Sequence, residues 1–332
     1  MSGGHTEPSP WAFGQRALPR LSDELRCAEP GSRPRALAAL CDLVHDPERA
    51  YETIKNGCLE QLKDLLKDED LSIRAKAAEV LHILAAHSVG REALLLWDVL
   101  SPLSELLGES DVSCRRNIHG TLNRLAHLPS GAEAMLTLGL VPRMLMKVGE
   151  EEEEDVKALL LSSISLCVRL DARPALASDG VSVLGQELSH ASSHIRTAAA
   201  AALLAISILQ EGKQRVCKEG LLPVLVRLLT DSDPGAQANA AGIIMNTAVA
   251  TQGKLQALDA EVLPPLLDLV SSRHRAVCLN ALQALTVLAE APAARQLLLD
   301  HLQLLRSRTG ADEEKIVRRA ANTAVRVVTW MP

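Results

Sequence analysis

Two kinds of sequence landmark recur along this chain at a nearly constant spacing. One is a helix break that follows a short helix, and the other is the central apolar position of a longer helix. The breaks fall 40 or 41 residues apart, at Gly57, Asp98, Gly139, Gly180, Gly220 and Glu261. The central positions keep the same spacing, at Leu40, Leu81, Leu122, Ser163, Leu203, Ile244, Leu285 and Val325. Because two independent landmarks agree, the sequence predicts a helical repeat of about 41 residues.

The pattern within one repeat is easiest to follow over residues 211–248. It predicts a short helix over 213–218, a second over 222–229 and a longer third over 236–248. The third helix carries one apolar stripe centred on Ile244. Three short helices cannot bury this stripe alone, so we expect it to pack against neighbouring repeats.

The repeats are predicted to cover nearly the whole chain. Residues 17–332 form eight units, with boundaries near residues 46, 88, 128, 171, 209, 250 and 291, and residues 1–16 form a flexible N-terminal arm. The first unit lacks its first helix, and the last has a degraded middle helix. Terminal repeats are expected to be atypical, because one of their faces meets water.

The composition agrees with a core made of helices. Hydrophobic residues make up 47% of the chain but aromatic residues only 2%, so Leu, Val, Ile and Ala must fill the core. Such a core favours close-packed helices over a sheet. The longest apolar run, residues 198–209, is too short to span a bilayer, and residues 1–16 lack the apolar core of a secretory signal. We therefore expect a soluble protein of the cytoplasm with no membrane partner.

The seven cysteines are scattered and form no Cys-x-x-Cys pair, which predicts neither disulfides nor a zinc site. His190 and His194 are spaced as metal ligands on a helix would be, but they fall on a predicted loop without a nearby cysteine or acid. No nucleotide-binding, zinc-protease or other catalytic motif occurs. The sequence therefore predicts no enzyme activity, no metal, no cofactor and no small-molecule substrate.

The net charge of -6 comes from one unbroken acidic run, Glu150 to Asp155. Without these residues the chain has 35 acidic and 35 basic side chains, so a sequence-independent grip on nucleic acid is not expected. The acidic run itself has two interpretations. It could dock a basic partner, or it could be a solvated loop that places negative charge at the start of the following helix.

Two repeats carry Gly-x-x-Pro between their first and second helices, at Gly139 to Pro142 and Gly220 to Pro223. This three-helix pattern resembles the armadillo repeat. The resemblance implies an all-α, armadillo-like right-handed α-solenoid of about eight repeats of about 41 residues. It also implies that the third helices line a concave groove, which is then the default surface for binding other proteins.

Several polar residues are candidates for binding a partner in this groove. Nuclear-import receptors of the armadillo type carry Trp and Asn columns on their third helices, and only Asn246 fits the Asn column here. The Trp column holds Glu79, Gly120, Leu161, Ala201, Gly242 and Gln283, which disfavours an import receptor. One turn earlier, another column holds Lys76, Asn117, Asn239 and Asn280. These side chains could hydrogen-bond an extended peptide, or they could simply be solvated.

Trp11 and Phe13 stand in the otherwise polar N-terminal arm. Aromatic residues are depleted in disordered segments, so these two could insert into a partner or fold back on the first repeat.

Six stretches between Gly14 and Pro292 give a more specific resemblance. They read GQRALPRLSDEL, ALAALCDLVHDPE, AEVLHILAAHSVGR, EGKQRVC, GKLQALDA and ALTVLAEAP. Together they resemble the radial spoke head protein fourteen family, armadillo-repeat components of the ciliary axoneme. The resemblance implies a structural part of the radial spoke, in its stalk and neck region, whose partners are other radial spoke proteins. It also implies a location in the cytoskeleton, in the axoneme of a cilium or flagellum, and a role in motility.

Two functions therefore follow as expectations. The first is a non-enzymatic scaffold of the axonemal radial spoke that holds other subunits through its groove and edges. The alternative is a soluble armadillo adaptor that binds extended peptides or cargo in its concave groove.

Overall fold

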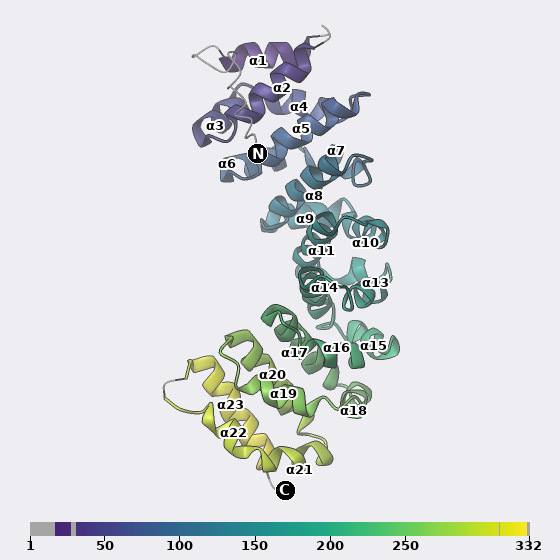
Figure 1. Cartoon of the computed structure of the whole chain (residues 1–332), viewed down its shortest axis with the longest axis vertical. Helices are drawn as coiled ribbons and strands as arrows, with labels where there is room; N and C mark the ends of the chain where they lie inside the picture. The colour runs from purple at the N-terminus through teal and green to yellow at the C-terminus, as the bar shows by residue number, and fades with distance from the viewer. Residues whose placement is uncertain (1–16, 28–30, 312, 331–332) are drawn as a thin grey trace, which may run out of the picture. The chain divides into compact units, whose positions relative to one another are not determined.

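The computed structural model describes residues 17–27, 31–311 and 313–330, and every regular element within them is an α-helix (Figure 1). This confirms the predicted all-α fold class. The chain divides into two compact parts, Met1–Ser163 and Ile164–Pro332, which we call the N-terminal half and the C-terminal half. The predicted arm, with Trp11 and Phe13, lies outside the described residues.

The helices follow one another as short, short and long within most repeats. Those of the N-terminal half are α1 (Ala17–Arg26), α2 (Ser32–Leu43), α3 (Pro47–Lys55), α4 (Cys58–Leu65), α5 (Leu71–Leu84), α6 (Ser88–Leu96), α7 (Leu100–Glu105), α8 (Val112–Ala126), α9 (Pro129–Thr137) and α10 (Leu140–Glu150). The next helix, α11 (Glu154–Val168), contains the boundary between the halves.

The C-terminal half continues the same order. Its helices after α11 are α12 (Arg173–Leu176), α13 (Gly180–Glu187), α14 (Ser193–Ile206), α15 (Gln210–Lys218), α16 (Leu222–Leu228), α17 (Pro234–Ala248), α18 (Thr251–Asp259), α19 (Leu263–Val270), α20 (Arg275–Leu288), α21 (Pro292–Asp300), α22 (Leu302–Ser307) and α23 (Lys315–Val328). From the second repeat on, the first helices begin at residues 47, 88, 129, 173, 210, 251 and 292, next to the unit boundaries expected from the sequence. None of the described helices is long and apolar enough to cross a membrane.

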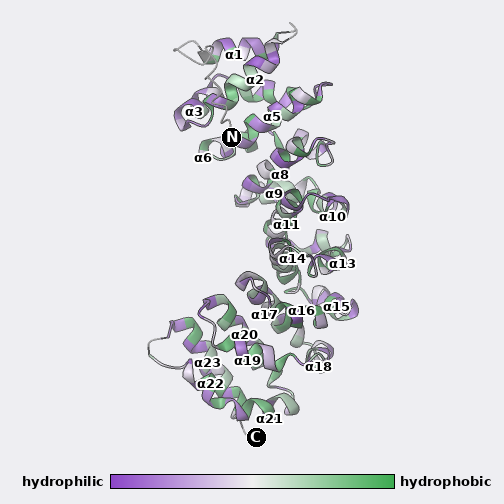
Figure 2. Ribbon diagram, viewed as in Figure 1, coloured by the Kyte–Doolittle hydropathy of each residue, from purple (hydrophilic) through white to green (hydrophobic). Residues whose placement is uncertain are grey.

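The third helices pack on one another within each half. α2, α5 and α8 lie side by side in the N-terminal half, and α14, α17, α20 and α23 do so in the C-terminal half (Figure 1). Figure 2 shows that hydrophobic and hydrophilic residues alternate along most helices, as amphipathic helices require. The predicted stripe is part of this core, because Leu203, Ile244 and Leu285 are fully buried on successive third helices.

The third helix of the opening stretch begins at Pro234, two residues before the predicted start. The reason is a cap that the sequence analysis did not weigh. The Asp233 carboxylate accepts hydrogen bonds from the backbone N–H of Gly235 at 2.7 Å and of Ala236 at 3.0 Å. Proline is favoured in the first turn of a helix, where its missing N–H has no intrahelical partner to lose.

The predicted helix breaks are residues in the left-handed backbone region, with one correction. Positive φ angles occur at Gly57, Asp98, Gly139, Asp179, Gly220 and Glu261. In the fifth unit the break is therefore Asp179 and not Gly180, which opens α13 instead. A Cβ on Gly180 would lie 2.6 Å from the backbone O of Ala175, so this glycine is required by a close approach.

A second series of glycines, which the sequence analysis missed, fixes the sharp turn from one repeat to the next. These glycines lie early in the first helices, at Gly90, Gly131, Gly212 and Gly253. A Cβ added to Gly131 would lie 2.1 Å from the backbone O of Leu125 at the end of the preceding third helix. The same clash, at 1.9 to 2.3 Å, arises at the other three positions. The first helix can therefore begin directly against the third helix that precedes it.

Candidate functional site

The candidate binding surface of the C-terminal half is the solvent-facing side of its third helices. Residues three or four positions apart along a helix lie on the same side of it. On α14, α17, α20 and α23, one such side carries residues that are at least partly exposed. We call this surface the third-helix face. Its residues include Thr197, Ala201, Leu204, Asn239, Met245, Asn280, Gln283, Thr286, Val287, Ile316, Arg319 and Thr323.

Two of the predicted binding residues connect neighbouring third helices. Asn239 Nδ2 donates to the backbone O of Thr197 at 3.2 Å, and Asn280 Nδ2 donates to the backbone O of Ala238 at 2.8 Å. Each bond reaches back to the preceding third helix, across 42 residues of sequence. Both side chains are half-buried. A side-chain amide has two N–H donors and one carbonyl acceptor, so each keeps some capacity for a further bond.

The remaining predicted binding residues are placed differently. Asn246 Nδ2 donates to Ser207 Oγ at 2.9 Å, again toward the preceding third helix. In the N-terminal half, Lys76 is exposed and pairs with Glu79 on its own helix, Nζ to Oε2 2.7 Å. Asn117 is half-buried on α8. The structure therefore brings Asn239 and Asn280 to one face of the C-terminal half, while Lys76 and Asn117 lie in the N-terminal half.

The absence of a Trp column has a steric reason at Gly120 and Gly242. Both glycines are buried under neighbouring side chains. A Cβ on Gly120 would lie 2.6 Å from Cε1 of His82, and one on Gly242 would lie 2.8 Å from Cδ1 of Leu204. No large side chain fits at either position without moving its neighbour, so the third helices pack closely here.

His82 is part of this packing rather than a titrating group at neutral pH. Burial, together with the nearby Arg124 guanidinium, lowers the pKa of His82 to about 4. Arg124 also donates to the backbone O of His82, which ties α8 to α5. The imidazole is therefore neutral under physiological conditions.

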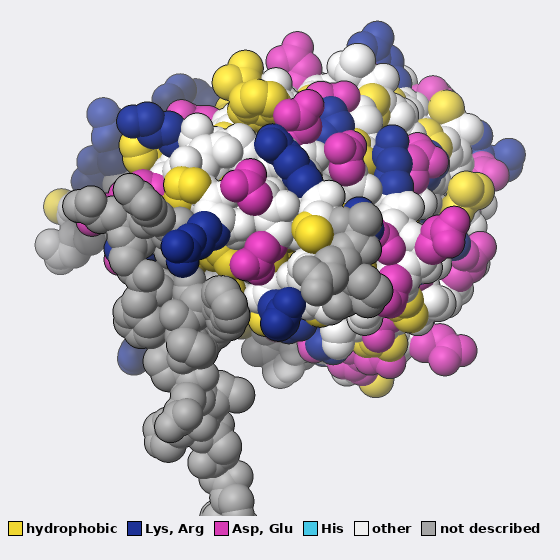
Figure 3. Space-filling model, turned by 90° about the horizontal axis from the view of Figure 1, so that it is seen from above, with side chains coloured by type: hydrophobic (Ala, Val, Ile, Leu, Met, Phe, Trp, Pro, Cys, Tyr) yellow, Lys and Arg dark blue, Asp and Glu magenta, His cyan; other side chains and the backbone are white. Residues whose placement is uncertain are grey.

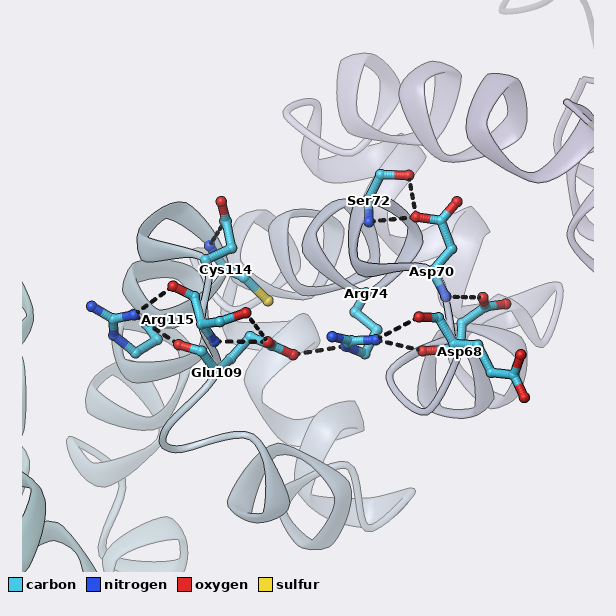
Figure 4. Close-up of polar contacts among 10 residues, drawn as sticks. Asp68, Asp70, Ser72, Arg74, Glu109, Cys114 and Arg115 are labelled. Carbon is cyan, nitrogen blue, oxygen red and sulfur yellow. Dashed lines mark hydrogen bonds and ion pairs between the residues drawn. The ribbon is translucent and has the colours of Figure 1, made fainter.

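A repeated arginine holds the loops at the start of the third helices. Arg74 Nε pairs with Glu109 Oε2 at 2.7 Å, and its Nη1 donates to the backbone O of Asp68 and Glu69 at 2.8 and 3.0 Å (Figure 4). One side chain thus binds its own loop and the corresponding loop of the next repeat. The hydrogen bond from Arg74 lowers the pKa of the Glu109 carboxyl. We call this arrangement a loop clamp.

The acidic run supplies the acid of the next loop clamp. Arg115 Nε lies 3.0 Å from Oε2 of Glu151, and Arg115 Nη2 lies 3.1 Å from Oε1. The Glu151 side chain is only 7% exposed, so the interpretation of the whole run as a solvated loop is wrong at this residue. Glu152 and Glu153 are exposed, and Glu154 and Asp155 form the first turn of α11, where negative charge suits the helix dipole.

The third-helix face is hollowed between α17, α20 and α23. This hollow, which we call the α20–α23 groove, has a volume of about 440 Å³ and is open to solvent. Its walls are mostly aliphatic. They are formed by Met245, Leu279, Gln283, Thr286, Val287, Ile316, Arg319, Ala320 and Thr323. An open groove with aliphatic walls suits apolar side chains of a bound peptide.

His190 and the buried cysteines Cys41 and Cys167 are held in structural surroundings. His190 Nδ1 accepts a hydrogen bond from the backbone N–H of Ser192 at 3.0 Å, while His194 is exposed in the first turn of α14. Within the described residues, no group of three or more His, Cys, Asp or Glu side chains could hold a metal ion. Burial raises the pKa of the Cys41 and Cys167 thiols to about 12, so both remain protonated at neutral pH.

Two comparisons with known proteins agree with this geometry. Residues 210–248, which form α15 to α17, match the family described as the Armadillo/beta-catenin-like repeat. A crystal structure of an engineered protein from the Northeast Structural Genomics Consortium superposes on this chain with a TM-score of 0.83. It is 22% identical in sequence, and the match covers 96% of this chain and 82% of the engineered one. The chain therefore has an armadillo-type helical-repeat fold, a scaffold that is typically non-enzymatic and that suggests protein–protein interaction.

Proposed function

We propose that this protein is a non-enzymatic scaffold of the axonemal radial spoke, where it holds other spoke subunits and supports ciliary motility. The observation that supports the scaffold part is the third-helix face, which presents an open groove of about 440 Å³ between three packed helices, α17, α20 and α23. The radial spoke part rests on the resemblance of the stretches between Gly14 and Pro292 to a family of spoke proteins.

The contacts between repeats suit a scaffold that must keep its shape under load. Each loop clamp joins two repeats through a charge-assisted hydrogen bond, and the asparagine bonds join successive third helices. Bonds to charged groups contribute about 1.5 to 3 kcal/mol each, more than neutral pairs. A surface supported in this way is ordered before a partner binds, which lowers the entropy cost of binding.

Fractionation of ciliated cells tests the proposal. Cells expressing the tagged full chain are treated with detergent to remove the membrane, and the axonemal and soluble fractions are compared. We expect the chain to stay with the axonemes and to crosslink to radial spoke subunits in mass spectrometry. Release with the soluble proteins, under conditions that keep known axonemal proteins in place, would contradict it.

A soluble adaptor is the second candidate, and the aliphatic walls of the α20–α23 groove favour it. Apolar side chains of an extended cargo peptide would fill such a groove. In that case the chain would leave with the soluble fraction together with its cargo, and crosslinks would join the third-helix face to proteins outside the axoneme.

A further inference from the structure

The last described helix presents a row of positive charges to solvent. Lys315, Arg319 and Arg326 are exposed on α23 and are spaced four and seven residues apart, so they lie on one side of the helix. Arg318 lies beside them and is half-buried. We call these four residues the basic stripe. Among the residues that the structure describes, no carboxylate forms an ion pair with any of them.

The two described acids that directly precede α23 already have partners. Glu313 pairs with Arg308, Oε1 to Nη1 2.8 Å, and Glu314 pairs with Arg275, Oε1 to Nη1 2.9 Å. On the face drawn in Figure 3, by contrast, basic and acidic side chains are interspersed. The basic stripe therefore differs from that surface in carrying one sign of charge that no described carboxylate neutralises in an ion pair.

The basic stripe also lines a hollow of its own. The described residues that line a hollow of about 550 Å³ are Lys315, Arg318, Arg319, Asn322, Thr323 and Arg326, which form its wall on α23. Arg319 and Thr323 are shared with the α20–α23 groove, so the cationic hollow and the aliphatic hollow adjoin along α23. Ile316, which is 42% exposed, stands on the aliphatic side.

We propose that the two hollows together bind an acidic segment of a partner protein. Its apolar side chains fill the α20–α23 groove, and its carboxylates pair with Arg319, Arg326 and Lys315. Arginine forms two parallel hydrogen bonds to a carboxylate, which gives direction as well as attraction. The inference rests on the proposed scaffold function and names the chemistry of one partner.

The walls favour a peptide over a nucleic acid. Proteins that bind single strands combine cationic grooves with aromatic side chains on which bases stack. None of the described residues that line the two hollows is aromatic, and the lining of the adjoining α20–α23 groove is mostly aliphatic. The net charge of -6 also works against a general attraction to polyanions.

Fluorescence anisotropy with the purified full chain tests the proposal. The probe is a labelled peptide of about 15 residues, close to the length of α23, in which Glu and Leu recur at helical spacing. One matched peptide has Gln in place of Glu, and another has Ser in place of Leu. We expect the acidic peptide to bind at least about tenfold more tightly than either, because each removes one of the two complementary features.

Charge reversal locates the site. The double variant Arg319→Glu with Arg326→Glu should weaken binding of the acidic peptide by at least about tenfold, and raising the salt concentration should weaken binding to the wild type. The matched control is Lys218→Glu with Arg227→Glu, which makes the same charge change on exposed positions of α15 and α16. The control should bind as the wild type does, and circular dichroism should show all proteins folded.

Several results would overturn the inference. One is that the Gln peptide binds as tightly as the acidic peptide, and another is that the acidic peptide shows no saturable binding. A third is that the control variant loses as much affinity as the double variant of α23. The last is that an oligouridine or phosphatidylserine vesicles bind more tightly than the acidic peptide. Axonemal retention is measured separately in cells. Retention without peptide binding would reject the proposed site for an acidic peptide and leave the scaffold function standing. Peptide binding without retention would reject the spoke assignment alone.

Discussion

Arg196 at the start of α14 and Asp231 before α17 form a two-point ion pair across successive repeats. Nε lies 2.7 Å from Oδ2 and Nη2 lies 3.0 Å from Oδ1, and the two side chains are only 17% and 5% exposed. Arg196 Nη1 also donates to the backbone O of His190 and Ala191 at 2.9 and 2.7 Å. Removing the arginine would therefore take the cationic partner from a buried carboxylate, which would keep only neutral donors such as the backbone N–H of Asp233, and the side-chain donor from two loop carbonyls.

This loop clamp predicts a pH-dependent stability. The hydrogen bond from Arg196 holds the pKa of the Asp231 carboxyl below its ordinary value of 3.8. A carboxyl with a lowered pKa contributes stability above its unfolded pKa and loses it as the pH falls through the folded pKa. We expect the free energy of unfolding in urea to fall with pH below about 4, and to fall less steeply in Asp231→Asn.

At neutral pH we expect Arg196→Gln to lower the free energy of unfolding by on the order of 2 kcal/mol, because the hydrogen bonds to the buried Asp231 carboxylate are lost. The matched control is Arg173→Gln. Arg173 is exposed, and among the described residues its ion pair is with Asp171, two residues away, so its replacement should have almost no effect. Equal losses in the two variants would mean that the clamp does not support the fold.

The glycine series predicts that a better helix former will destabilise the protein. Gly131→Ala should lower the free energy of unfolding by about 1 to 3 kcal/mol, because its Cβ would lie 2.1 Å from the backbone O of Leu125. Gly149→Ala is the control, since it is helical and exposed with no atom within 4 Å of the added Cβ. Gly149→Ala should raise the free energy of unfolding by up to about 1 kcal/mol, because alanine has a higher helix propensity than glycine. Similar changes in both variants would refute the close approach.

The fold could be predicted because its main signal is periodic. Positions such as Ile244 and Leu285 recur at the repeat length and are buried for the same reason in each repeat, so one well-formed unit identifies the others. The break at Asp179 was misplaced because the neighbouring Gly180 is the usual residue for a positive φ. Either of these adjacent residues could have been the one with a positive φ. The close approach of Gly180 to Ala175, which the sequence does not show, distinguishes them.

The site was less predictable, because it depends on contacts between repeats. Asn239 and Asn280 were recognised as a column, but their bonds to backbone carbonyls of the preceding third helix require the distance between helices. The α20–α23 groove likewise depends on how α23 packs on α20. The loop clamps do have a signal in the sequence. Arg33, Arg74 and Arg115 recur 41 residues apart, and the acids Asp68 and Glu109 recur at the same spacing.

A further prediction concerns backbone strain at Glu261. Its φ of 56° lies in the left-handed region, where a Cβ costs roughly 1 to 2 kcal/mol. Because the Glu261 side chain is exposed, Glu261→Gly should raise the free energy of unfolding by about 0.5 to 1 kcal/mol, the gain being reduced by the greater entropy of glycine in the unfolded chain. Glu261→Ala keeps a Cβ and should show no such gain. Thermal unfolding of the three proteins measures the difference, and a gain in the alanine variant would exclude backbone strain as its cause.

The last prediction separates a structural role of Asn280 from a binding role. Its Nδ2 donates to the backbone O of Ala238 on the neighbouring third helix, so Asn280→Ala should cost about 1 kcal/mol of stability even without a partner. Asn322 is the matched control, because its Nδ2 donates to the backbone O of Arg318 within its own helix and its side chain is exposed. Asn322→Ala should leave the urea midpoint nearly unchanged. If Asn280→Ala also left it unchanged, the bond between repeats would contribute nothing to the fold, and a role in binding a partner would become the better explanation of this asparagine.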